Sequence, residues 1–342
     1  MYPARRRRTR GDCMTPLLEL RNVTKTFAPR QDATGRFVRA VTGRQPPKGV
    51  HAVTDLSLSV SAGEVVGLVG ESGCGKSTVG RLAAGVYWPT SGKRYWQDTD
   101  MASLGRRERD RAELDIQMIF QDPYASLNPR MRAADIVAEG AHVHGFIRKA
   151  DTRDFVGTLF ERVGLDPDSM DRFAHQFSGG QRARIGIARA LSVNPKFLVC
   201  DESVAALDVS IQAQVLNLFI KLREELGLTY LFISHDLGVV RHIADRIVVM
   251  YLGKIVESGP TEQVYQNPQH PYTQALLAEV PSLDKRKKTF YAIKGEIPSP
   301  MNPPAGCHFH PRCPHALPVC KEAAPELKRA ADGQFAACHL ID

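Results

Sequence analysis

Apolar residues recur along the first part of this chain in patterns that predict strands. Residues 51–60 (HAVTDLSLSV) alternate apolar and polar side chains from Val53 onward, which is typical of a strand with one buried face. Residues 64–70 (EVVGLVG) form a continuous apolar run, which is typical of a fully buried strand. Residues 17–27 (LLELRNVTKTF) predict a further strand, and the Gly-, Pro- and Arg-rich residues 28–49 predict an exposed loop.

The middle of the chain has a pattern of strand, helix and strand. The apolar runs 197–200 (FLVC) and 229–234 (TYLFIS) end at Asp201 and His235. The residues between them, 211–227 (IQAQVLNLFIKLREELG), have apolar positions at helical spacing. Because a helical crossover joins parallel strands, we expect an α/β fold with a parallel sheet at its core.

The character of the sequence changes after Pro260. Residues 246–259 (RIVVMYLGKIVESG) predict two short strands about Gly253, and the sequence beyond them becomes rich in Pro and Cys. We therefore expect a domain boundary near Thr261, which divides the chain into a main domain, 14–260, and a C-terminal extension, 261–342.

The strand at 64–70 runs into a glycine-rich loop that fits the pattern G-x-x-x-x-G-K-[ST] and opens a predicted helix. Its glycines let backbone N–H groups turn toward phosphate oxygens, Lys76 adds a positive charge, and Ser77 supplies a hydroxyl for Mg²⁺. Cys74 lies at the helix start, where the pKa of a thiol can be lowered, but we interpret it as a loop filler. The ATP-binding residues expected here are Gly70, Glu71, Ser72, Gly73, Cys74, Gly75, Lys76, Ser77 and Thr78.

Two adjacent acids follow the strand at 197–200. The strand delivers Asp201 to the edge of the sheet where Mg²⁺ would bind, so we expect this carboxylate to hold the metal ion. Glu202 is expected to take the proton of the attacking water. The alternative is an ordinary acidic loop or helix cap, and the phosphate loop in the same sheet makes it the weaker interpretation.

A second glycine-led helix start occurs at FSGGQRARIGIARAL, residues 177–191. Ser178, Gly179 and Gly180 offer a hydroxyl, free N–H groups and the positive end of a helix dipole, which together predict another anion site. One chain cannot easily use both sites on one nucleotide. A head-to-tail dimer can, because each phosphate loop then faces the second site of the partner.

These motifs, in this order, resemble the ATP-binding subunits of ABC transporters over nearly the whole chain. The resemblance implies an α/β fold of the P-loop NTPase class, of the ABC type. In it, a mixed sheet core is joined by an antiparallel β subdomain and by a helical subdomain, here about 122–190. The signature motif of the family is matched by Ser178, Gly179, Gly180 and Gln181, which would bind the ATP of a partner subunit.

The resemblance also implies roles for single residues. Gln121 matches the Q-loop residue that reaches Mg²⁺ and the attacking water, and His235 matches the switch histidine that bonds the γ-phosphate. Phe27 stands where the family places the aromatic that stacks on adenine, although a core aromatic is an alternative. The D-loop is matched by Ala206, Leu207 and Asp208.

The sequence departs from the family pattern at two positions. Ser203 replaces the usual Pro after the catalytic Glu, and Ala205 replaces the usual Ser before the D-loop. We still expect hydrolysis, because Lys76, Glu202 and His235 are all present. The departures bear on hydrogen bonding across the dimer.

The C-terminal extension resembles that of the dipeptide, oligopeptide and nickel importer branch of the family, through NPQHPYTQALLAEVPS and the Pro-rich stretch that follows. The branch implies two transmembrane permease subunits, a second ATPase subunit that is a paralogue, and a substrate-binding protein. It also implies a peripheral position on the cytoplasmic face of the membrane.

Four cysteines lie in this extension with the spacing C-x5-C-x6-C-x17-C: Cys307, Cys313, Cys320 and Cys338. A small irregular segment has too little hydrophobic core to be stable without a cross-link. Because a cytosolic protein seldom has disulfides, a bound metal is the natural candidate for that cross-link. Four thiolates suit a [4Fe–4S] cluster or Zn²⁺, and the resemblance favours the cluster. Free cysteines are the alternative. One of the neighbouring His308, His310, His315 and His339 could replace a cysteine as ligand, but we interpret these histidines as packing or surface residues.

Composition changes this picture little. The 342 residues carry a net charge of +8, and 43% are hydrophobic. Half of the charge excess lies in residues 1–13, with five Arg and one Asp, ahead of Met14 as an alternative start. We interpret this tail as a start-site artefact or an inert arm rather than a lipid or nucleic-acid contact, and expect no nucleic-acid partner. No run is long enough to span a membrane, and no secretory signal follows the charged start.

The sequence therefore predicts an ATPase that uses ATP and Mg²⁺ to power peptide import through permease subunits. Two alternatives are the ATPase of a nickel importer and a soluble ABC ATPase of a non-transport complex, such as phosphonate-degrading machinery. A third, a nucleic-acid-associated ATPase or regulatory binding module, is supported only by the Arg-rich tail, and the C-terminal extension argues against it.

Overall fold

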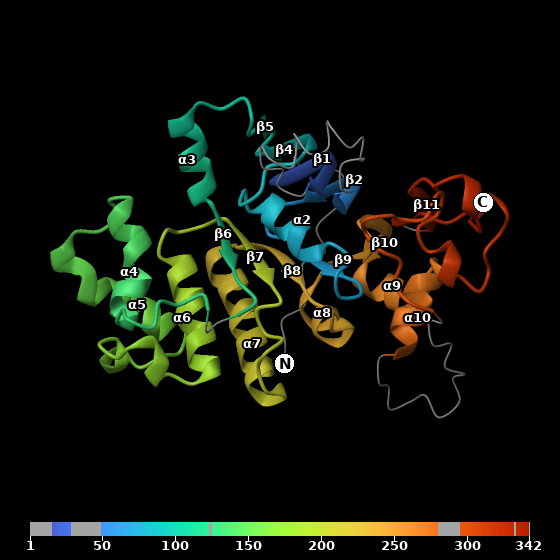
Figure 1. Ribbon diagram of the computed structural model, residues 1–342. Coiled ribbons are helices and arrows are strands. Elements are labelled where there is room, and N and C mark those ends of the chain that lie inside the picture. The colour runs from blue at the N-terminus through green and yellow to red at the C-terminus, as the bar shows by residue number, and fades with distance from the viewer. Residues whose placement is uncertain (1–15, 29–48, 123–124, 280–294, 332, 342) are drawn as a thin grey trace, which may run out of the picture.

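A computed structural model describes residues 16–28, 49–122, 125–279, 295–331 and 333–341 of the chain. The basic tail and almost all of the loop predicted at 28–49 lie outside these ranges. The described elements form two sheets, a group of helices at one end of the molecule and the C-terminal extension at the other (Figure 1).

The larger sheet is mixed and contains eight strands within the described residues. β3 runs parallel to β8 and β9, while β10 returns antiparallel to β9 about Gly253. The predicted strand, helix and strand are confirmed as β7, α7 and β8, with β7 and β8 parallel. In sheet order the strands are β11 (Lys328–Ala331), β12 (Gln334–Ala336), β10 (Lys254–Pro260), β9 (Arg246–Tyr251), β3 (Val65–Val69), β8 (Thr229–Ile233), β7 (Phe197–Asp201) and β6 (Ile116–Ile119).

The smaller sheet is antiparallel and confirms the strands predicted at 17–27 and 51–60. Successive side chains of a strand point to opposite faces, and from Leu56 onward every second residue of the strand 50–60 is buried. Val53 is also buried, but the register shifts between Val53 and Leu56. Among the described residues its strands are, in sheet order, β2 (Val50–Val60), β1 (Leu18–Phe27), β4 (Ser91–Trp96) and β5 (Thr99–Asp100).

The α-helices cover both faces of the larger sheet or gather beside it. α4, α5 and α6 form the end of the molecule that lies opposite the C-terminal extension (Figure 1). The α-helices are α2 (Lys76–Ala83), α3 (Arg106–Leu114), α4 (Ala133–Val143), α5 (Thr152–Arg162), α6 (Gly179–Leu191), α7 (Val209–Leu226), α8 (Leu237–Ile243), α9 (Thr261–Gln266), α10 (Pro271–Glu279) and α11 (Val319–Glu322). Single 3-10 turns lie at Lys149–Asp151, Pro167–Ser169, Ala174–Gln176 and His310–Arg312.

Two apolar cores lie on opposite faces of the larger sheet. Val66 and Leu68 of β3 join the core shared with α2 and the smaller sheet, whereas Val65 and Val69 join the core under α6, α7 and α8. This division follows from the two-residue period of a strand. The continuous apolar run at 64–70 is thus needed because both faces are covered.

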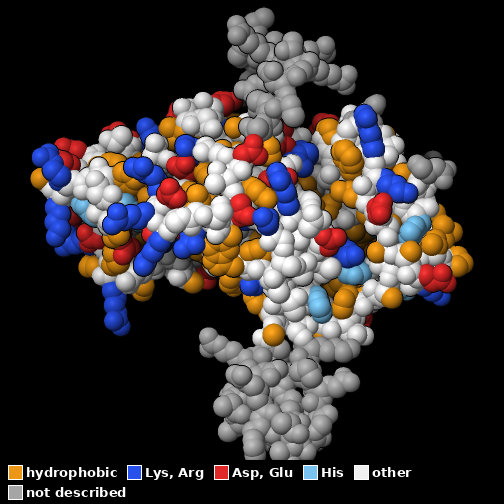
Figure 2. Space-filling view, turned by 90° about the horizontal axis from the view of Figure 1, so that it is seen from above, with side chains coloured by type: hydrophobic (Ala, Val, Ile, Leu, Met, Phe, Trp, Pro, Cys, Tyr) orange, Lys and Arg blue, Asp and Glu red, His pale blue; other side chains and the backbone are white. Residues whose placement is uncertain are grey.

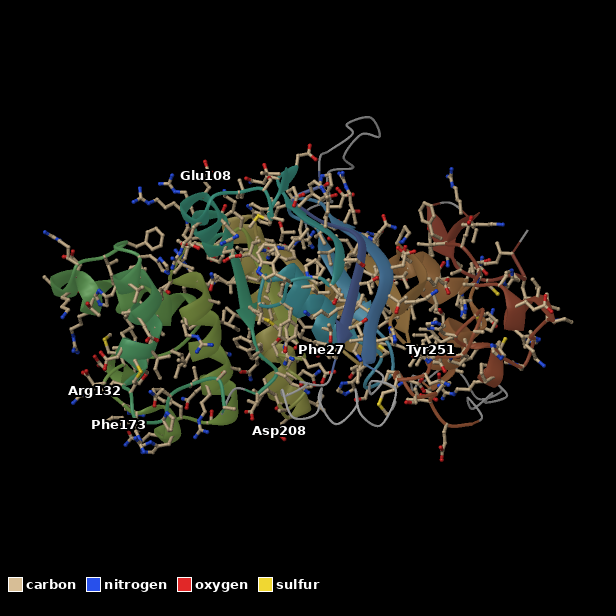
Figure 3. All side chains as sticks on the ribbon, turned by 45° about the horizontal axis from the view of Figure 1, so that its top comes forward. Phe27, Glu108, Arg132, Phe173, Asp208 and Tyr251 are labelled. Carbon is tan, nitrogen blue, oxygen red and sulfur yellow. The ribbon has the colours of Figure 1, made fainter. Side chains whose placement is uncertain are left out.

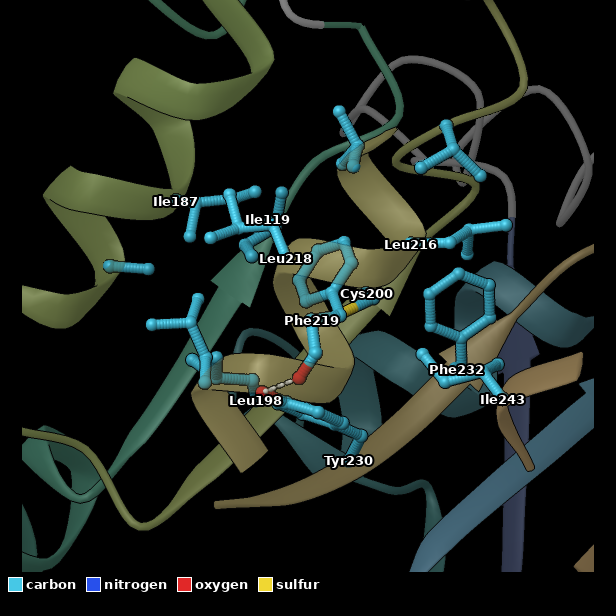
Figure 4. Close-up of a cluster of buried hydrophobic side chains, with 14 of the residues drawn as sticks. Ile119, Ile187, Leu198, Cys200, Leu216, Leu218, Phe219, Tyr230, Phe232 and Ile243 are labelled. Atoms are coloured by element: carbon cyan, nitrogen blue, oxygen red, sulfur yellow. Dashed lines mark hydrogen bonds between the residues drawn. The ribbon is translucent and has the colours of Figure 1, made fainter. Parts of the chain in front are cut away.

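Phe219 of α7 anchors the second core. Its ring packs edge-on against Tyr230 and Phe232 of β8, at centroid distances of 5.7 and 5.9 Å (Figure 4). The Tyr230 hydroxyl donates to the Phe219 carbonyl oxygen over 3.0 Å, so the buried phenol is satisfied. Truncating such an aromatic to Ala costs about 3–5 kcal/mol.

The predicted small Cys-rich C-terminal lobe is not confirmed. β12 pairs with β10 and extends the main sheet. Glu257 of β10 is fully buried, and its carboxylate accepts from the backbone N–H groups of Gln269 and His270 and from the side chain of Gln334. The division at Thr261 stays a prediction.

The surface carries charges of both signs. Lys and Arg side chains are interspersed with Asp and Glu side chains on the face shown in Figure 2. Within the described ranges, no helix combines the length and the apolar character that crossing a membrane requires.

Candidate active site

The glycine-rich loop after β3 is shaped by close backbone contacts. Gly70 and Gly75 have positive φ angles of 150° and 107°, and a Cβ at either position would lie 2.2 Å from a backbone carbonyl oxygen, of Met250 or of Ala52. No other residue fits such an approach. Gly75 immediately precedes α2, so the loop leads directly into the N-terminus of this helix, an end that favours anions.

Lys76 is buried and folds back over this loop. Its Nζ donates to the carbonyl oxygens of Gly70 and Glu71 over 2.8 and 3.0 Å. These bonds hold the ammonium group over the concave side of the loop. A phosphate bound there would meet a positive charge that is already in place.

The Ser77 hydroxyl donates to the carboxylate of Asp201 over 2.9 Å. Burial raises the pKa of Asp201, and the bond from Ser77 offsets part of this rise. Ser77 of α2 and Asp201 of β7, two of the predicted Mg²⁺ ligands, therefore place their side-chain oxygen atoms next to each other. Carboxylate and hydroxyl oxygens, with water and phosphate, are the ligands that Mg²⁺ prefers, so these residues fit the ion.

The three predicted catalytic side chains, those of Gln121, Glu202 and His235, lie together. The Gln121 amide donates to one carboxylate oxygen over 2.8 Å, and His235 Nδ1 lies 3.5 Å from the other. Glu202 has a φ of 47°, a region that residues other than glycine seldom adopt, and its N–H donates to the Ile233 carbonyl oxygen over 3.0 Å. Backbone strain of this kind is typical of functional sites.

A cavity of about 320 Å³ lies between these groups and the end of β1. Phe27 is 38% exposed and lines it, so this ring is not a core aromatic. Its edge-on contact with Tyr87, at a centroid distance of 5.4 Å, fixes one side of the ring. The cavity is lined by Phe27, Val50, Ala52, Ser72, Gly73, Gly75, Lys76, Ser77, Thr78, Gln121, Glu202 and Pro300.

The signature residues start α6, far along the molecule from Phe27. Ser178 Oγ accepts from the Gln181 N–H, and Gln181 Oε1 accepts from the Ser178 N–H, which is a capping box. A Cβ at Gly180 would lie 2.5 Å from Ile211 of α7, so this glycine also serves close helix packing. Figure 3 shows Phe27 in the middle of the molecule and Phe173, shortly before α6, toward the end formed by α4 to α6.

None of the residues that line the cavity belongs to the signature, among those that the structure describes. The two predicted anion sites of this chain are therefore separate. This separation is what the head-to-tail arrangement requires.

The D-loop connects Glu202 to α7. Ala206 and Asp208 are exposed, Leu207 packs against the core, and Asp208 is the residue before the helix. Ser203 is buried, and its hydroxyl has no hydrogen-bond partner among the described residues. The family's usual Pro would avoid this unsatisfied group.

Known families match this chain in two segments. The family described as ABC transporter matches residues 53–205, and the one described as Oligopeptide/dipeptide transporter, C-terminal region, matches residues 256–320. The oligopeptide transport ATP-binding protein AppF of Bacillus subtilis (strain 168) is 52% identical over 95% of this chain and 97% of AppF. The chain belongs to the ABC transporter family. The predicted family is thereby confirmed.

Further ABC proteins are similar to this member of the family. The oligopeptide transport ATP-binding protein OppF of Salmonella typhimurium is 51% identical over 83% of this chain and 86% of OppF. The structure of the ATP-binding cassette MJ0796, a dimer bound to ADP and Pi, has a TM-score of 0.61 at 27% identity. It covers 71% of this chain and 98% of the cassette, so the ABC fold is confirmed.

The four cysteines of the extension are free thiols in this ABC protein. Cys307 donates its N–H to the Cys320 carbonyl oxygen over 2.8 Å, which brings their backbones together. Within the described residues, however, no group of three or more His, Cys, Asp or Glu side chains is arranged to hold a metal ion. The cysteines as placed do not fit the predicted cluster or Zn²⁺.

Three residues of the C-terminal extension that the sequence did not indicate contact or line the candidate nucleotide site: Tyr272, Pro300 and Arg312. Tyr272 lies in the stretch NPQHPYTQ, which indicated the transporter branch but not a contact. Nothing in the spacing of Pro300 or Arg312 points to a loop more than 200 residues earlier. Only the packing of the extension brings them there.

Proposed function

We propose that this chain is the ATPase subunit that powers the import of peptides across the cytoplasmic membrane. The observation that carries the proposal is the assembled site around Glu202 in a chain that also has the C-terminal region of oligopeptide and dipeptide transporters. Similarity to AppF and OppF confirms the predicted class, an ATPase subunit of a peptide transporter. It does not favour the nickel importer or the soluble complex.

In this proposal the loop 70–78 binds the phosphates of ATP, and Phe27 stacks on adenine. Mg²⁺ is held by Ser77 and Asp201, and Gln121 reaches the ion and the attacking water. Glu202 accepts the proton of that water, and the nearby His235 bonds the γ-phosphate. The hydrogen bond from Gln121 and the close approach of His235 support this division of roles, because both side chains already face the Glu202 carboxylate.

The signature residues, 178–181, are proposed to cover the ATP of a second ATPase subunit, a paralogue, with the D-loop at 206–208 beside them. The separation of these residues from the cavity of their own chain supports this arrangement. The dimeric MJ0796 cassette, which is bound to ADP and Pi, is similar to this chain.

Two permease subunits are the proposed membrane partners, supplied by a substrate-binding protein. A cavity of about 880 Å³ beside Gln121 supports this assignment, because it lies between the sheet and α4 and bears exposed apolar side chains. Val86, Phe120 and Val143 line it and are 52%, 40% and 74% exposed. The proposed location is therefore the cytoplasmic face of the membrane.

ATP and Mg²⁺ are the proposed cofactors. A [4Fe–4S] cluster or Zn²⁺ at Cys307, Cys313, Cys320 and Cys338 rests on the resemblance alone, because no group of three or more His, Cys, Asp or Glu side chains among the described residues could hold a metal ion. Metal analysis and a visible absorption spectrum of the anaerobically purified chain test it. Less than stoichiometric iron and zinc rejects both.

Uptake by cells tests the proposed function. In a strain that lacks the chromosomal copy, we expect the wild-type chain to restore uptake of a labelled oligopeptide and Glu202→Gln not to restore it. Glu262→Gln, which changes an exposed carboxylate away from the site, is the matched control and should restore uptake. Restored uptake of nickel without uptake of peptides would contradict the proposal.

Partners are tested with tagged Glu202→Gln purified from detergent-solubilised membranes in the presence of ATP. Two multispanning proteins and a second ATPase subunit are the expected companions. A complex without any membrane-spanning protein, from a chain with verified ATP binding, would contradict peptide import.

A further inference from the structure

The phosphate loop is tied to the C-terminal extension by an ion pair. Arg312, in the turn before Cys313, contacts the Glu71 carboxylate through both terminal nitrogens, over 2.7 and 2.9 Å. The Arg312 side chain is 6% exposed and that of Glu71 is 22% exposed. Two parallel bonds between planar groups define orientation as well as distance.

A second contact acts on the same loop residue. The Tyr272 hydroxyl of α10 accepts from the Glu71 N–H over 2.9 Å. Tyr272 is fully buried and packs against Tyr251 and Phe309, with ring centroids 4.8 and 5.4 Å away. Both the backbone and the side chain of Glu71 are therefore held by a rigid aromatic cluster and its neighbour Arg312.

Glu71 is connected directly to the lysine of the site. Its carbonyl oxygen accepts from Lys76 Nζ over 3.0 Å. The extension also reaches the cavity itself, because the Pro300 carbonyl oxygen accepts from the His51 N–H over 3.0 Å and Pro300 lines the cavity. The C-terminal extension thus contacts the nucleotide site at two places.

We propose that Arg312 is a positioning residue for ATP binding: through Glu71 it holds the phosphate loop in the conformation that receives the phosphates. The C-terminal extension is then a structural part of the ATP site. This inference rests on the proposed function of the loop. The pair lies in a mostly buried setting, where removing one partner leaves the other charge unpaired and the loop free to move.

The test measures equilibrium binding of a fluorescent ATP analogue to the full-length chain and to Arg312→Gln, Glu71→Gln and the double variant. We expect each single variant to raise the Kd about tenfold. The Kd of the double variant should be no higher than that of either single variant, since the two residues act as a unit. Arg312→Lys, which keeps one bond and the charge, should recover part of the affinity. The melting temperatures of the ligand-free variants are measured first, and the titrations are run at a temperature at which every variant is folded.

Arg241→Gln is the matched control. Arg241 also makes a two-bond contact, through Nε and one terminal nitrogen, with Glu262, but these side chains are 51% and 59% exposed and lie away from the loop. Its Kd should stay within about twofold of wild type.

Equal affinities of wild type and Arg312→Gln, or additive losses in the double variant, would overturn the inference while leaving the assignment of the ATP site intact. A wild-type chain that binds no ATP analogue overturns both.

Discussion

The hydroxyl of Ser77 and the carboxylate of Asp201 lie 2.9 Å apart, although 124 residues separate them in the chain. Ser77 is placed by the first turn of α2 and Asp201 by the end of β7, and both elements pack against β3 or its neighbours. Two oxygen ligands are therefore brought together at the edge of the sheet. A divalent ion bound there would replace the hydrogen bond that now joins them.

Asp201→Asn should remove the metal-dependent step. Because a neutral amide is a poor Mg²⁺ ligand, we expect kcat for ATP hydrolysis to fall by about 100-fold, with nucleotide binding in EDTA changed by less than about twofold. Phosphate release and a binding titration measure the two quantities. Asp115→Asn, which breaks only the surface pair with Lys196, is the control, and equal kcat values for the two variants would reject the assignment.

Glu202→Gln should separate binding from hydrolysis. The amide oxygen still accepts from Gln121, but the side chain no longer takes a proton, so kcat should fall by about 100- to 1000-fold while ATP still binds. In a mixture of this variant with the paralogous ATPase subunit, light scattering should then show an ATP-dependent increase in mass, as blocked hydrolysis holds the dimer closed. Hydrolysis at more than a third of the wild-type rate would be incompatible with Glu202 as the base.

Cys74 should be slow to alkylate. The position of this thiol at a helix start suggests a lowered pKa, but burial raises the pKa of Cys74 instead. Since the thiolate is the reactive form, we expect iodoacetamide to modify Cys74 at least about tenfold more slowly in the native chain than in urea. Peptide mass spectrometry measures both rates, with Cys74→Ser confirming the assignment, and similar rates would show that the loop opens freely.

His270 should make the folded chain sensitive to acid. Burial lowers the pKa of His270 to about 4 from 6.5, and Nδ1 accepts from the Tyr272 N–H. Between these pH values the unfolded chain binds a proton that the folded chain does not, so stability falls as the pH decreases. The expected loss from this residue is about 3 kcal/mol between pH 7 and 4.

Urea unfolding across this pH range measures the loss. His270→Asn keeps an acceptor for the Tyr272 N–H without a titrating group. Between pH 7 and 4, the unfolding free energy of this variant should therefore fall by about 3 kcal/mol less than that of the wild-type chain. Identical pH profiles for the two chains would rule out His270 as the source.

The local pattern of the sequence was enough to predict most of the proposed ATP site. The loop at 70–78, the acids after an apolar strand and the glycines before α6 each depend on short stretches whose chemistry is the same in any context. Strands β1, β2, β3, β7 and β8 and helix α7 were likewise predictable, because their apolar periods differ clearly from those of loops.

Other features needed the tertiary structure, because contacts between distant segments leave no trace in local spacing. The sequence did not reveal that β12 pairs with β10, so the extension was expected to be a lobe of its own. It suggested four metal ligands among the cysteines, whereas the described part of the chain has no group of three or more His, Cys, Asp or Glu side chains that could hold a metal ion.

The sequence by itself determined the chemistry proposed for this protein: a phosphate loop, a metal-binding acid, a catalytic glutamate and a second helix start for a partner's nucleotide. Only the tertiary structure decided which remote side chains hold that chemistry in place. Arg312 meets Glu71 across 241 residues because the sheet and the aromatic cluster bring the extension against the loop. Such a contact arises from the packing of whole elements, whose relative positions no short stretch of sequence specifies.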